Sequence, residues 1–449
     1  MKRNFLLALI LFTATLAADP AALFAQMTRS VTMKEAIELS IKNSKSLKNS
    51  KAKIEEATAV LKEAAERRLP NVGFSGSYLR LNNPNVNVKI KTNSGGEGGS
   101  GSQNAGKPSS ALYGIANASL PIYAGLRIKY GIESSKYLQE AARLDAENDR
   151  EAVILNTIEA YENLYKSKAA VDLVKENLES NRQRVKNFSN LEKNGLLARN
   201  DLLKAELQES NTELSLLDAE NNWKLANINM NLILGLPDNN VLLVNGDDLQ
   251  PASVQLKSME DYVQLGLQNR KDVSALSFRK KAASTGVKSA KGEKYPSIAL
   301  TGGYIAANIP DILTVTNAVN IGLGVKYNLS FWKSNTQIEQ AKAREKQLSA
   351  NEEMLFDAVQ LQISQAYQNY LLSQKKTEVY QKAISQAEEN YKIVKNKFNN
   401  ALATATDLLD ADVAQLQAKL DSAFSKADAS VAYNKLLLTA GLLDIPENK

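Results

Sequence analysis

The amino-acid sequence contains one succession of segments twice, and this internal repeat limits the possible folds more than any other feature. The segment TMKE at residues 32–35 is echoed 226 residues later by SMED at residues 258–261. The same offset carries Pro70 onto Pro296. Both prolines stand where a helical pattern gives way to an alternating one, so the same junction occurs in both halves.

The last part of each repeat follows a shorter offset. DLL at residues 201–203 is matched by DLL at residues 407–409, about 206 residues later. The repeated unit is therefore a helix, two strands, a long helix, a turn and a further helix. We predict a first repeat at residues 26–257 and a second repeat at residues 258–449.

Local signals set the ends of the predicted helices. Thr32 and Glu35 form a capping box in front of the first helix, and Pro70 ends it. The stretch 124–193 lacks proline, so a helix of roughly seventy residues would be about 105 Å long. Apolar residues recur along it at every third or fourth position, as in a coiled coil. The predicted elements are helices at about 33–68, 124–193, 200–234, 258–292, 333–399 and 406–441, and strands at about 72–81, 111–123, 297–307 and 317–331.

The segment Asn317–Phe331 alternates between apolar and polar residues, which is the period of a β-strand with one dry face. It is long enough for the roughly 9–11 residues that a tilted strand needs to cross a bilayer. Taken alone, it suits a half-buried strand of a soluble sandwich equally well. In a membrane the lipid-facing residues would be Ile321, Leu323 and Val325, and the lumen-facing residues would be Gly322, Gly324, Lys326 and Asn328.

The four predicted strands are too few to close within one chain. In lipid every strand edge must be paired, and the smallest closed barrels have about eight strands. We therefore predict an oligomer whose barrel has about 8, 12 or 16 strands. The long helices continue from the strands, so a helical tube would follow the barrel, and the whole would be a conduit.

Residues 1–25 are typical of a secretory signal. Lys2 and Arg3 precede an apolar core at residues 5–16, and we expect cleavage after Ala25, with three earlier alanines as alternatives. The apolar core is shorter than the ~20 residues of a spanning helix, and no other segment is a continuous apolar run of that length. We therefore expect the mature chain to be exported.

The composition argues against catalysis and metal binding. The chain has no cysteine and no histidine, which removes thiolate chemistry and the commonest metal ligand. Two glycine patterns between residues 82 and 110 imitate phosphate-binding loops, but no helix follows Gly96-x-Gly98-x-x-Gly101, and Pro108 replaces the hydroxyl residue of a Walker A motif. The net charge of +6 gives no indication of nucleic acid binding. We predict no enzyme activity, no cofactor and no metal site.

Several segments resemble the TolC-like outer-membrane efflux protein family over almost the whole mature chain. They are MKEAIELSIKNS (33–44), RRLPNVGFSGSY (67–78), LPIYAGLRIKYGIESSK (120–136), EKNGLLARNDLLKAELQ (192–208), NLILGLP (231–237) and NNALATATDLLDADVAQLQ (399–417). The resemblance implies a mixed α/β membrane protein: a homotrimer with a 12-stranded transmembrane β-barrel continued by a long α-helical coiled-coil barrel. It also implies a location in the cell outer membrane, with the helices in the periplasm.

The function that the resemblance implies is that of an exit duct in a tripartite efflux or type I secretion system. Its partners would be outer-membrane lipid, a periplasmic adaptor protein and an inner-membrane transporter. The alternative is an exported coiled-coil scaffold or adhesin without channel activity, which would explain the helices but not the two strand pairs. Nothing in the sequence identifies the cargo.

Three carboxylates lie close to the predicted tight turns between helices. Asp201 follows the first turn, and Asp407 and Asp410 follow the second. In a trimer each would form a ring that attracts cations at a constriction, and the resemblance implies acidic rings at this place. The alternative for Asp201 and Asp407 is helix capping, or a first-turn carboxylate that complements the helix dipole, and the alternative for Asp410 is a solvated helix face.

The second turn departs from the pattern of the family. The resemblance implies basic and hydroxyl side chains that tie the closed tip together, but Phe398 and Ala403 stand at the corresponding positions. Neither side chain can donate a hydrogen bond. Closure is then expected to rest on helix packing or on another residue such as Arg199.

Overall fold

The computed structural model describes residues 28–82, 108–246, 256–310, 312–327 and 331–443. The predicted signal segment, the two glycine patterns and Asn328 lie outside these residues. Among the described elements, the order helix, helix, strand, strand, long helix, helix runs from α2 to α5 and again from α6 to α9.

Contacts divide the chain into two compact units, each built from segments that are distant in sequence. One unit, here called the helical unit, comprises Met1–Ser50, Ala146–Val273 and Phe356–Lys449. The other, here called the sheet unit, comprises Lys51–Asp145 and Ser274–Leu355. Each unit draws on both predicted repeats, so the compact units do not follow the repeat boundary.

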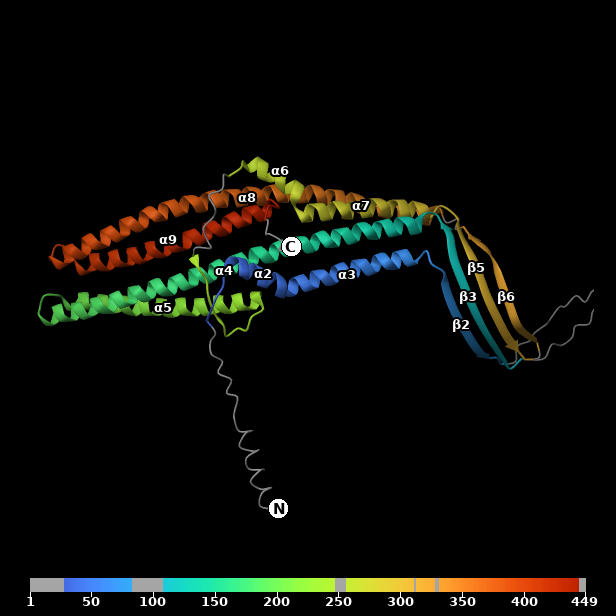
Figure 1. Cartoon of the computed structure of the whole chain (residues 1–449), viewed down its shortest axis with the longest axis horizontal. Coiled ribbons are helices and arrows are strands. Elements are labelled where there is room, and N and C mark those ends of the chain that lie inside the picture. Colours follow the sequence, from blue (N-terminus) through green and yellow to red (C-terminus); the bar gives the residue numbers. More distant parts are fainter. Residues whose placement is uncertain (1–27, 83–107, 247–255, 311, 328–330, 444–449) are drawn as a thin grey trace, which may run out of the picture. The chain divides into compact units, whose positions relative to one another are not determined.

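The sheet unit contains an antiparallel sheet with the strand order β2-β3-β5-β6 (Figure 1). Its strands are β2 (Asn71–Arg80), β3 (Ser110–Ala124), β5 (Ser297–Ile309) and β6 (Leu313–Lys326). Each of them alternates larger apolar side chains with small or polar ones, which suits a sheet with two unlike faces. Strands β2 and β6 each pair with one neighbour in the chain and are the edges of the sheet.

Strand β6 differs at both ends from the prediction of 317–331. It ends at Lys326, which pairs with Ser297, the first residue of the neighbouring strand β5. The alternation continues to Phe331, but Phe331 already begins helix α8. At the other end β6 begins at Leu313, and a bulge with Asn317 at a φ of 57° accommodates the register shift opposite β5.

A second bulge interrupts the alternation of β3. The sequence places Ile122 on the same face as Leu120, by simple alternation. In the structure the register shifts between Pro121 and Tyr123, and Tyr123 is the residue that pairs with Ile298. The bulge therefore brings Tyr123, rather than Ile122, into line with the face of Leu120.

The two predicted first helices of the repeats are each broken near the end of their third turn. The expected helix 33–68 is α2 (Met33–Asn43) followed by α3 (Lys45–Glu66). Ser44 leaves the helical conformation with a ψ of 123°, and its hydroxyl accepts a hydrogen bond from the Leu47 backbone NH at 3.2 Å. The break is thus a helix end followed at once by a new N-cap.

The corresponding break in the second repeat lies at Arg270. It separates α6 (Met259–Asn269) from α7 (Lys271–Gly292), where one helix at 258–292 was predicted. Arg270 has a ψ of 132° and its guanidinium is paired with Asp272 at 2.7 Å. That local ion pair offsets the helical hydrogen bonds that are lost at the break.

Two helical hairpins provide most of the helical unit (Figure 1). The first consists of α4 (Arg127–Lys193) and α5 (Arg199–Leu234), and the second of α8 (Phe331–Asn399) and α9 (Ala405–Thr439). Helix α5 ends at Gly235, whose φ of 68° suits glycine and whose NH caps the helix. Many of the buried side chains are alanine or serine, which allows the helices to approach closely.

The helical unit also holds a short parallel strand pair that the sequence does not predict. β1 (Thr28–Ser30) pairs with β4 (Val241–Leu243). Tyr161, which is fully buried, donates its hydroxyl to the Val31 carbonyl at 3.1 Å beside this pair. Three-residue strands carry too little alternation to be recognised, and this pair is held by side chains of Tyr161 on α4 and Asn227 on α5.

None of the helices in the described part of the chain combines the length and the apolar character that a membrane span requires.

Candidate functional site

Both helical hairpins of the helical unit end in the same kind of turn. Leu196 donates its backbone NH to the Leu191 carbonyl at 2.9 Å, and Leu402 donates to the Lys397 carbonyl at 2.8 Å. This bond is typical of a helix end with a residue in the left-handed region. That residue is Gly195, with a φ of 71°, in the first turn, and Ala401, with a φ of 57°, in the second.

An apolar cluster joins the two hairpins at these turns. Its buried members are Phe188, Leu202, Ala205, Ala405, Leu408 and Leu409. Phe398 packs against it, with its ring centroid 5.2 Å from that of Phe188. Phe398, which departs from the pattern that the resemblance implies, thus contributes apolar packing. Arg199 forms a 4.0 Å ion pair with Glu192 of its own hairpin.

Asp407 caps helix α9. Its carboxylate accepts hydrogen bonds from the backbone NH and the hydroxyl of Thr404, at 2.8 and 2.7 Å, and its own NH donates to the Thr404 hydroxyl. These hydrogen bonds hold the pKa of Asp407 below its usual value. The capping role, one of the alternatives for Asp407, is therefore present in the chain.

Asp201 is not the N-cap residue of α5, but it is the acidic residue in the first turn of that helix, where its charge complements the helix dipole. The N-cap residue of α5 is Ala198, which has no side-chain capping bond. The Asp201 carboxylate instead accepts a hydrogen bond from Lys204 at 3.3 Å, and Lys204 also donates to the Thr406 hydroxyl at 3.0 Å. Lys204 therefore links Asp201 to the start of the second hairpin and offsets part of its charge.

Asp410 is exposed on α9, and its side chain makes no hydrogen bond or ion pair with another described residue. Asp201, Asp407 and Asp410 thus have three different surroundings: a lysine, a capping box and solvent. Of the three, Asp410 alone has no partner in the described part of the chain.

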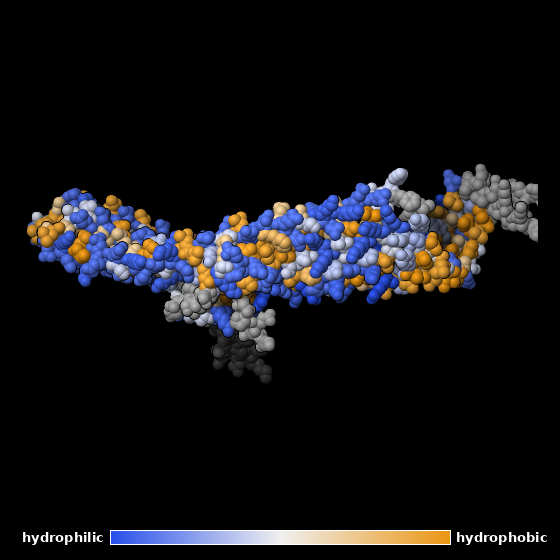
Figure 2. All heavy atoms as spheres, turned by 90° about the horizontal axis from the view of Figure 1, so that it is seen from above, coloured by the Kyte–Doolittle hydropathy of each residue, from blue (hydrophilic) through white to orange (hydrophobic). Residues whose placement is uncertain are grey.

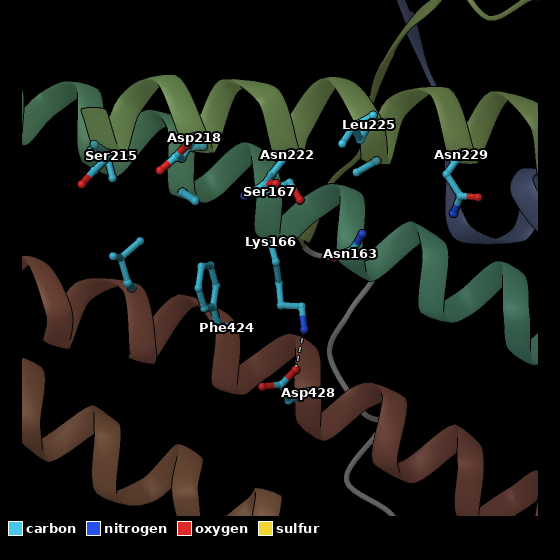
Figure 3. A pocket seen from close by; sticks show the side chains of 15 residues that line it. Asn163, Lys166, Ser167, Ser215, Asp218, Asn222, Leu225, Asn229, Phe424 and Asp428 are labelled. Atoms are coloured by element: carbon cyan, nitrogen blue, oxygen red, sulfur yellow. Dashed lines mark hydrogen bonds and ion pairs between the residues drawn. The ribbon is translucent and has the colours of Figure 1, made fainter. Parts of the chain in front are cut away.

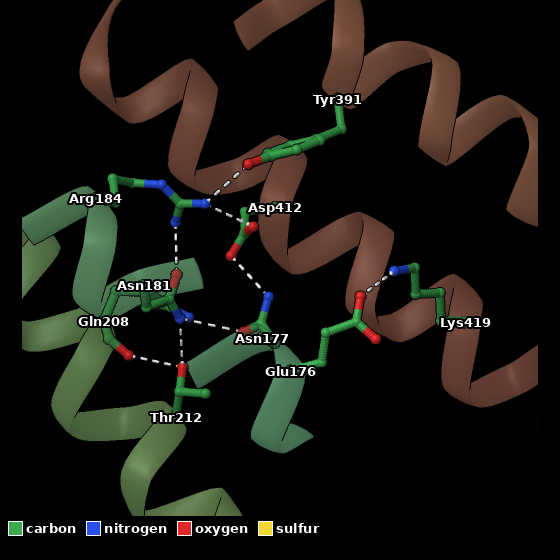
Figure 4. A network of polar contacts seen from close by, with 9 residues as sticks. All are labelled: Glu176, Asn177, Asn181, Arg184, Gln208, Thr212, Tyr391, Asp412 and Lys419. Carbon is green, nitrogen blue, oxygen red and sulfur yellow. Dashed lines mark hydrogen bonds and ion pairs between the residues drawn. The ribbon is translucent and has the colours of Figure 1, made fainter. Parts of the chain in front are cut away.

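A buried polar network lies further along the same hairpins and was not predicted (Figure 4). The Arg184 guanidinium contacts the Asp412 carboxylate at 2.7 Å, the Asn181 amide oxygen at 2.6 Å and the Tyr391 hydroxyl at 3.2 Å. Asn177 donates to Asp412, and Asn181 donates to Thr212. The network therefore connects α4, α5, α8 and α9.

The charges in this network stabilise each other. Burial lowers the pKa of Arg184, but the hydrogen bond and the charge of Asp412 outweigh that effect and raise it. The one signal in the sequence was the position of Asp412, three residues after the apolar Leu409 on the face that packs. The partner could not be read from the sequence, because Arg184 lies 228 residues away.

A hollow of about 830 Å³ lies between α4, α5 and α9 (Figure 3). At its edge the Lys166 ammonium group of α4 forms an ion pair with the Asp428 carboxylate of α9 at 2.7 Å.

Glu162 lies one helical turn before Lys166 and is fully buried. Burial raises the pKa of Glu162 to about 8, although the Ser430 hydroxyl, Lys166 and the Val431 backbone oppose the shift.

The predicted lipid-facing and lumen-facing residues of β6 lie on opposite faces of the sheet. Ile321, Leu323 and Val325 pair with Gly302, Leu300 and Ile298. Residues directly opposite in an antiparallel pair share a face, so these six lie together. Gly322, Gly324 and Lys326 pair with Thr301, Ala299 and Ser297 on the other face. Asn328 is outside the described residues.

The apolar face extends over all four strands. Val72, Phe74 and Tyr78 of β2 pair with Ala118, Ala116 and Leu112 of β3, and the register then continues to β5 and β6. Phe74 is 83% exposed and Ile321 is 80% exposed. Figure 2 shows hydrophobic residues gathered over the strands of the sheet unit. So large an exposed apolar surface marks a face that is covered by lipid or protein.

No group of three or more acidic side chains that could hold a metal ion occurs within the ranges that the structure describes.

Comparison with known proteins gives one family. The family model described as "Outer membrane efflux protein" matches residues 36–236 and 262–442. No curated protein sequence matches the chain.

Solved structures of similar fold include VceC from Vibrio cholerae, with 19% identity, a TM-score of 0.73 and coverage of 91% of this chain and 96% of that one. The Campylobacter jejuni CmeC outer membrane channel has 19% identity, a TM-score of 0.74 and coverage of 92% and 86%. The Neisseria gonorrhoeae MtrE outer membrane channel has 15% identity, a TM-score of 0.69 and coverage of 91% and 89%. At these identities the likeness concerns the fold.

Proposed function

The chain belongs to the outer membrane efflux protein family and is located in the outer membrane, and from this premise we propose that it forms a homotrimeric exit duct. The duct would pass substrates from the periplasm or from an inner-membrane pump to the exterior. The observation that carries the proposal is the four-stranded sheet, which has one continuous apolar face and two unpaired edges.

The unpaired edges support an assembly of several copies. In lipid, the backbone groups of β2 and β6 would lack partners unless another strand pairs with each. Pairing β6 of one copy with β2 of the next closes a ring, and three copies would give twelve strands, within the range of known barrels. The apolar face with Ile321, Leu323 and Val325 would then meet outer-membrane lipid, and Gly322, Gly324, Lys326 and Asn328 would face the lumen.

The helical unit offers a second surface for the same assembly. Helix α5 leaves a row of leucines exposed, and α8 leaves another row of apolar residues exposed. These residues are Leu203, Leu207, Leu214, Leu217, Leu225 and Leu232 on α5, and Leu361, Leu372, Val379 and Ile393 on α8. Rows at such spacing are typical of helices that pack against a further helix. We propose that α5 of one copy meets α8 of the next in an α-helical barrel.

The order of elements supports an origin by internal duplication, as the repeated sequence segments predict. In the proposed trimer both hairpin turns would lie at the periplasmic tip. Asp201, Asp407 and Asp410 would each occur three times there and would attract cations at the constriction. A periplasmic adaptor protein and an inner-membrane transporter are the proposed partners at this tip, in a tripartite efflux or type I secretion system.

Labelling of single cysteines tests the channel directly, because the chain contains no cysteine of its own. Leu323→Cys and Gly324→Cys are adjacent residues on opposite faces of β6. A water-soluble thiol reagent should label Gly324→Cys in outer-membrane vesicles and leave Leu323→Cys unlabelled. Equal labelling of both variants would contradict the assignment of the faces.

Two further measurements separate the duct from the scaffold alternative. A trimeric barrel should migrate on a gel with a mobility that changes on heating, and the purified protein should conduct ions in a planar bilayer. An exported scaffold or adhesin would fractionate without the membrane and would not conduct. The exposed apolar face of the sheet favours the duct.

A further inference from the structure

A small polar pocket of about 220 Å³ lies in the sheet unit, where β6 ends and α8 begins. It is here called the junction pocket. Arg127 enters it from the first residue of α4, Lys326 from the last residue of β6, and Lys333 and Ser334 from the start of α8. Glu293 lines it from the turn before β5. Three separate elements thus bring cations to one place.

The positive charges in the junction pocket are not balanced. The single carboxylate in its lining, Glu293, is 3.9 Å from the Arg127 guanidinium. Neither Lys326 nor Lys333 has an ion pair or a side-chain hydrogen bond with any residue that the structure describes. Both lysines are exposed and line the same small pocket, so an anion bound there would be attracted by both.

A neighbouring hollow adds to the same field. It is lined by Lys291, Lys294 and Lys342, and Glu339 is its one carboxylate. These lysines also lack an ion pair within the described ranges. Clustered charge of one sign raises the local concentration of counter-ions, so the whole junction attracts anions.

The backbone around Arg127 is tightly packed, which fixes the position of its side chain. Gly125 has a φ of 63°, and a Cβ at either Gly125 or Gly292 would overlap the carbonyl oxygen of the other. Only glycine therefore allows the two turns to cross so closely. The Arg127 Nε atom donates to the Ala124 carbonyl at 3.1 Å, which orients the rest of the guanidinium towards Glu293 and the pocket.

The junction pocket also contains polar atoms without partners. The Ser334 hydroxyl oxygen and the Gln337 amide oxygen are shielded from solvent and form no hydrogen bond with the described residues. A buried polar group without a partner is unfavourable, because it has lost its hydrogen bonds to water. A bound oxyanion would accept a hydrogen bond from Ser334, and a protonated phosphate oxygen would donate one to Gln337.

We propose that the junction pocket binds a phosphate oxyanion. Lys326 and Lys333 supply the charge, Arg127 is held at the rim by Glu293, and the Ser334 hydroxyl donates a hydrogen bond. The phosphate could belong to the headgroup of an anionic phospholipid or to a free phosphate-bearing solute, which share this chemistry. The site is a feature of the single protomer and goes beyond the proposed duct, which does not require it.

Binding to the full-length protein in detergent tests the proposal at low ionic strength, where screening is weak. One arm titrates inorganic phosphate by calorimetry. The other measures, by native mass spectrometry, whether phosphatidylglycerol is retained in preference to phosphatidylethanolamine. The test variant is Lys326→Gln with Lys333→Gln. The matched control is Lys129→Gln with Lys346→Gln, which removes two exposed lysines of the sheet unit that line neither hollow.

We expect the wild type and the control to bind equally, and the test variant to bind at least ~10-fold more weakly, as the loss of charge-assisted hydrogen bonds implies. Weaker binding of inorganic phosphate by the test variant would identify a free anion as the ligand. Loss of the preference for phosphatidylglycerol in the test variant would identify a lipid headgroup as the ligand. Ser334→Ala, which removes only the hydroxyl, should weaken the same arm without a change of charge. Absence of binding in both arms, or equal weakening in test and control variants, would overturn the proposal. Conductance of the same preparations shows separately whether the duct is formed.

Discussion

The Arg184 guanidinium and the Asp412 carboxylate form a 2.7 Å ion pair whose side chains are only 7% and 2% exposed. The pair joins α4 to α9 and therefore one helical hairpin to the other. Burying two charges is unfavourable unless their remaining hydrogen-bonding groups are satisfied. Asn177, Asn181 and Tyr391 satisfy them here. The ion pair and its hydrogen bonds thus fix the register between the two hairpins, which apolar packing alone would leave less strictly defined.

Removing one member of this pair should destabilise the helical unit strongly. Asp412→Ala leaves the Arg184 charge buried without a counter-ion, and we expect a loss of about 3–5 kcal/mol in the free energy of unfolding. Urea unfolding in detergent, followed by circular dichroism, measures it.

The matched control for this prediction is the pair of Glu176 and Lys419, which joins the same two helices at 3.3 Å on the surface (Figure 4). Lys419→Ala should cost less than about 1 kcal/mol, since exposed pairs contribute little. Replacing both buried partners, with Arg184→Met and Asp412→Leu, should restore most of the stability. Equal effects of Asp412→Ala and Lys419→Ala would contradict the prediction.

The pH dependence of stability should depend on Glu162. Burial raises its pKa from 4.5 to about 8 in the folded protein. Between these two values the unfolded chain releases the proton and the folded chain keeps it. Stability therefore falls as the pH rises from about 4.5 to about 8, by up to about 1.4 kcal/mol for each pH unit.

Glu162→Gln should remove this slope, because the amide stays neutral at every pH. Unfolding midpoints at pH 5 and pH 8.5 should therefore converge in the variant and differ in the wild type. Glu159→Gln, an exposed position on the same helix, is the control and should keep the slope of the wild type. A slope that Glu162→Gln leaves unchanged would assign the pH dependence to other groups.

The features that sequence reasoning predicted are those that depend on neighbours in the chain. Thr32 caps α2 as predicted, by accepting a hydrogen bond from the Glu35 backbone NH, but the other half of the predicted capping box is absent from the described residues because the Glu35 carboxylate pairs with Arg29. The opposite faces of β6 need only the alternation from Val319 to Val325. The helix turns follow from Asn194-Gly195 and from the residues after Asn399. These local signals position the long elements well.

The features that it missed depend on residues that are distant in sequence. The end of β6 lies where β5 begins, since Lys326 pairs with Ser297, the first residue of β5. The partner of Asp412 is 228 residues away on another helix. The break at Ser44 is an exception, because it depends on a local bond from the Leu47 NH to the Ser44 hydroxyl, which resembles many serine contacts that do not end a helix. The hydrophobic periodicity of the sequence does not indicate contacts of this kind.

Lys204 should reduce the effect of Asp201 on ion selectivity. Its ammonium group lies 3.3 Å from the Asp201 carboxylate, so part of the negative charge at the proposed constriction is offset. In the proposed trimer, Lys204→Gln should raise the ratio of cation to anion permeability by a factor of about two to five. This factor corresponds to the ~0.5–1 kcal/mol of electrostatic energy that an exposed ion pair contributes. Reversal potentials across a salt gradient in planar bilayers measure this ratio.

The converse variant completes that test. Asp201→Asn should lower the cation preference, and the double change with Lys204→Gln should return it to about the value of the wild type. If Asp201, Asp407 and Asp410 are all replaced by alanine and neither conductance nor block by divalent cations changes, the acidic rings have no role.

Asp407 and Asp410 should differ in what they stabilise. The hydrogen bonds from Thr404 lower the pKa of Asp407, so its capping contribution is present above about pH 3.8 and is lost as the pH falls through the lowered value. Asp407→Ala should therefore lower the unfolding midpoint at pH 7 and reduce the acid sensitivity. Asp410→Ala, three residues on and exposed, should leave the midpoint unchanged and alter only the conductance. Equal midpoints for both variants would exclude the capping role.

The two hairpin turns offer an internal comparison of backbone strain. Ala401 has a φ of 57° where the other turn has Gly195 at 71°. A residue with a Cβ in this region is strained by roughly 1–2 kcal/mol, whereas glycine loses more chain entropy on folding, about 0.4–1 kcal/mol. Ala401→Gly should therefore raise the free energy of unfolding by up to about 1 kcal/mol, and Gly195→Ala should lower it by a similar amount. No atom lies within 4 Å of a Cβ built at Gly195, so steric overlap would not confuse the result. Denaturant midpoints that move in the same direction for both variants would show that strain at Ala401 is relieved by its surroundings.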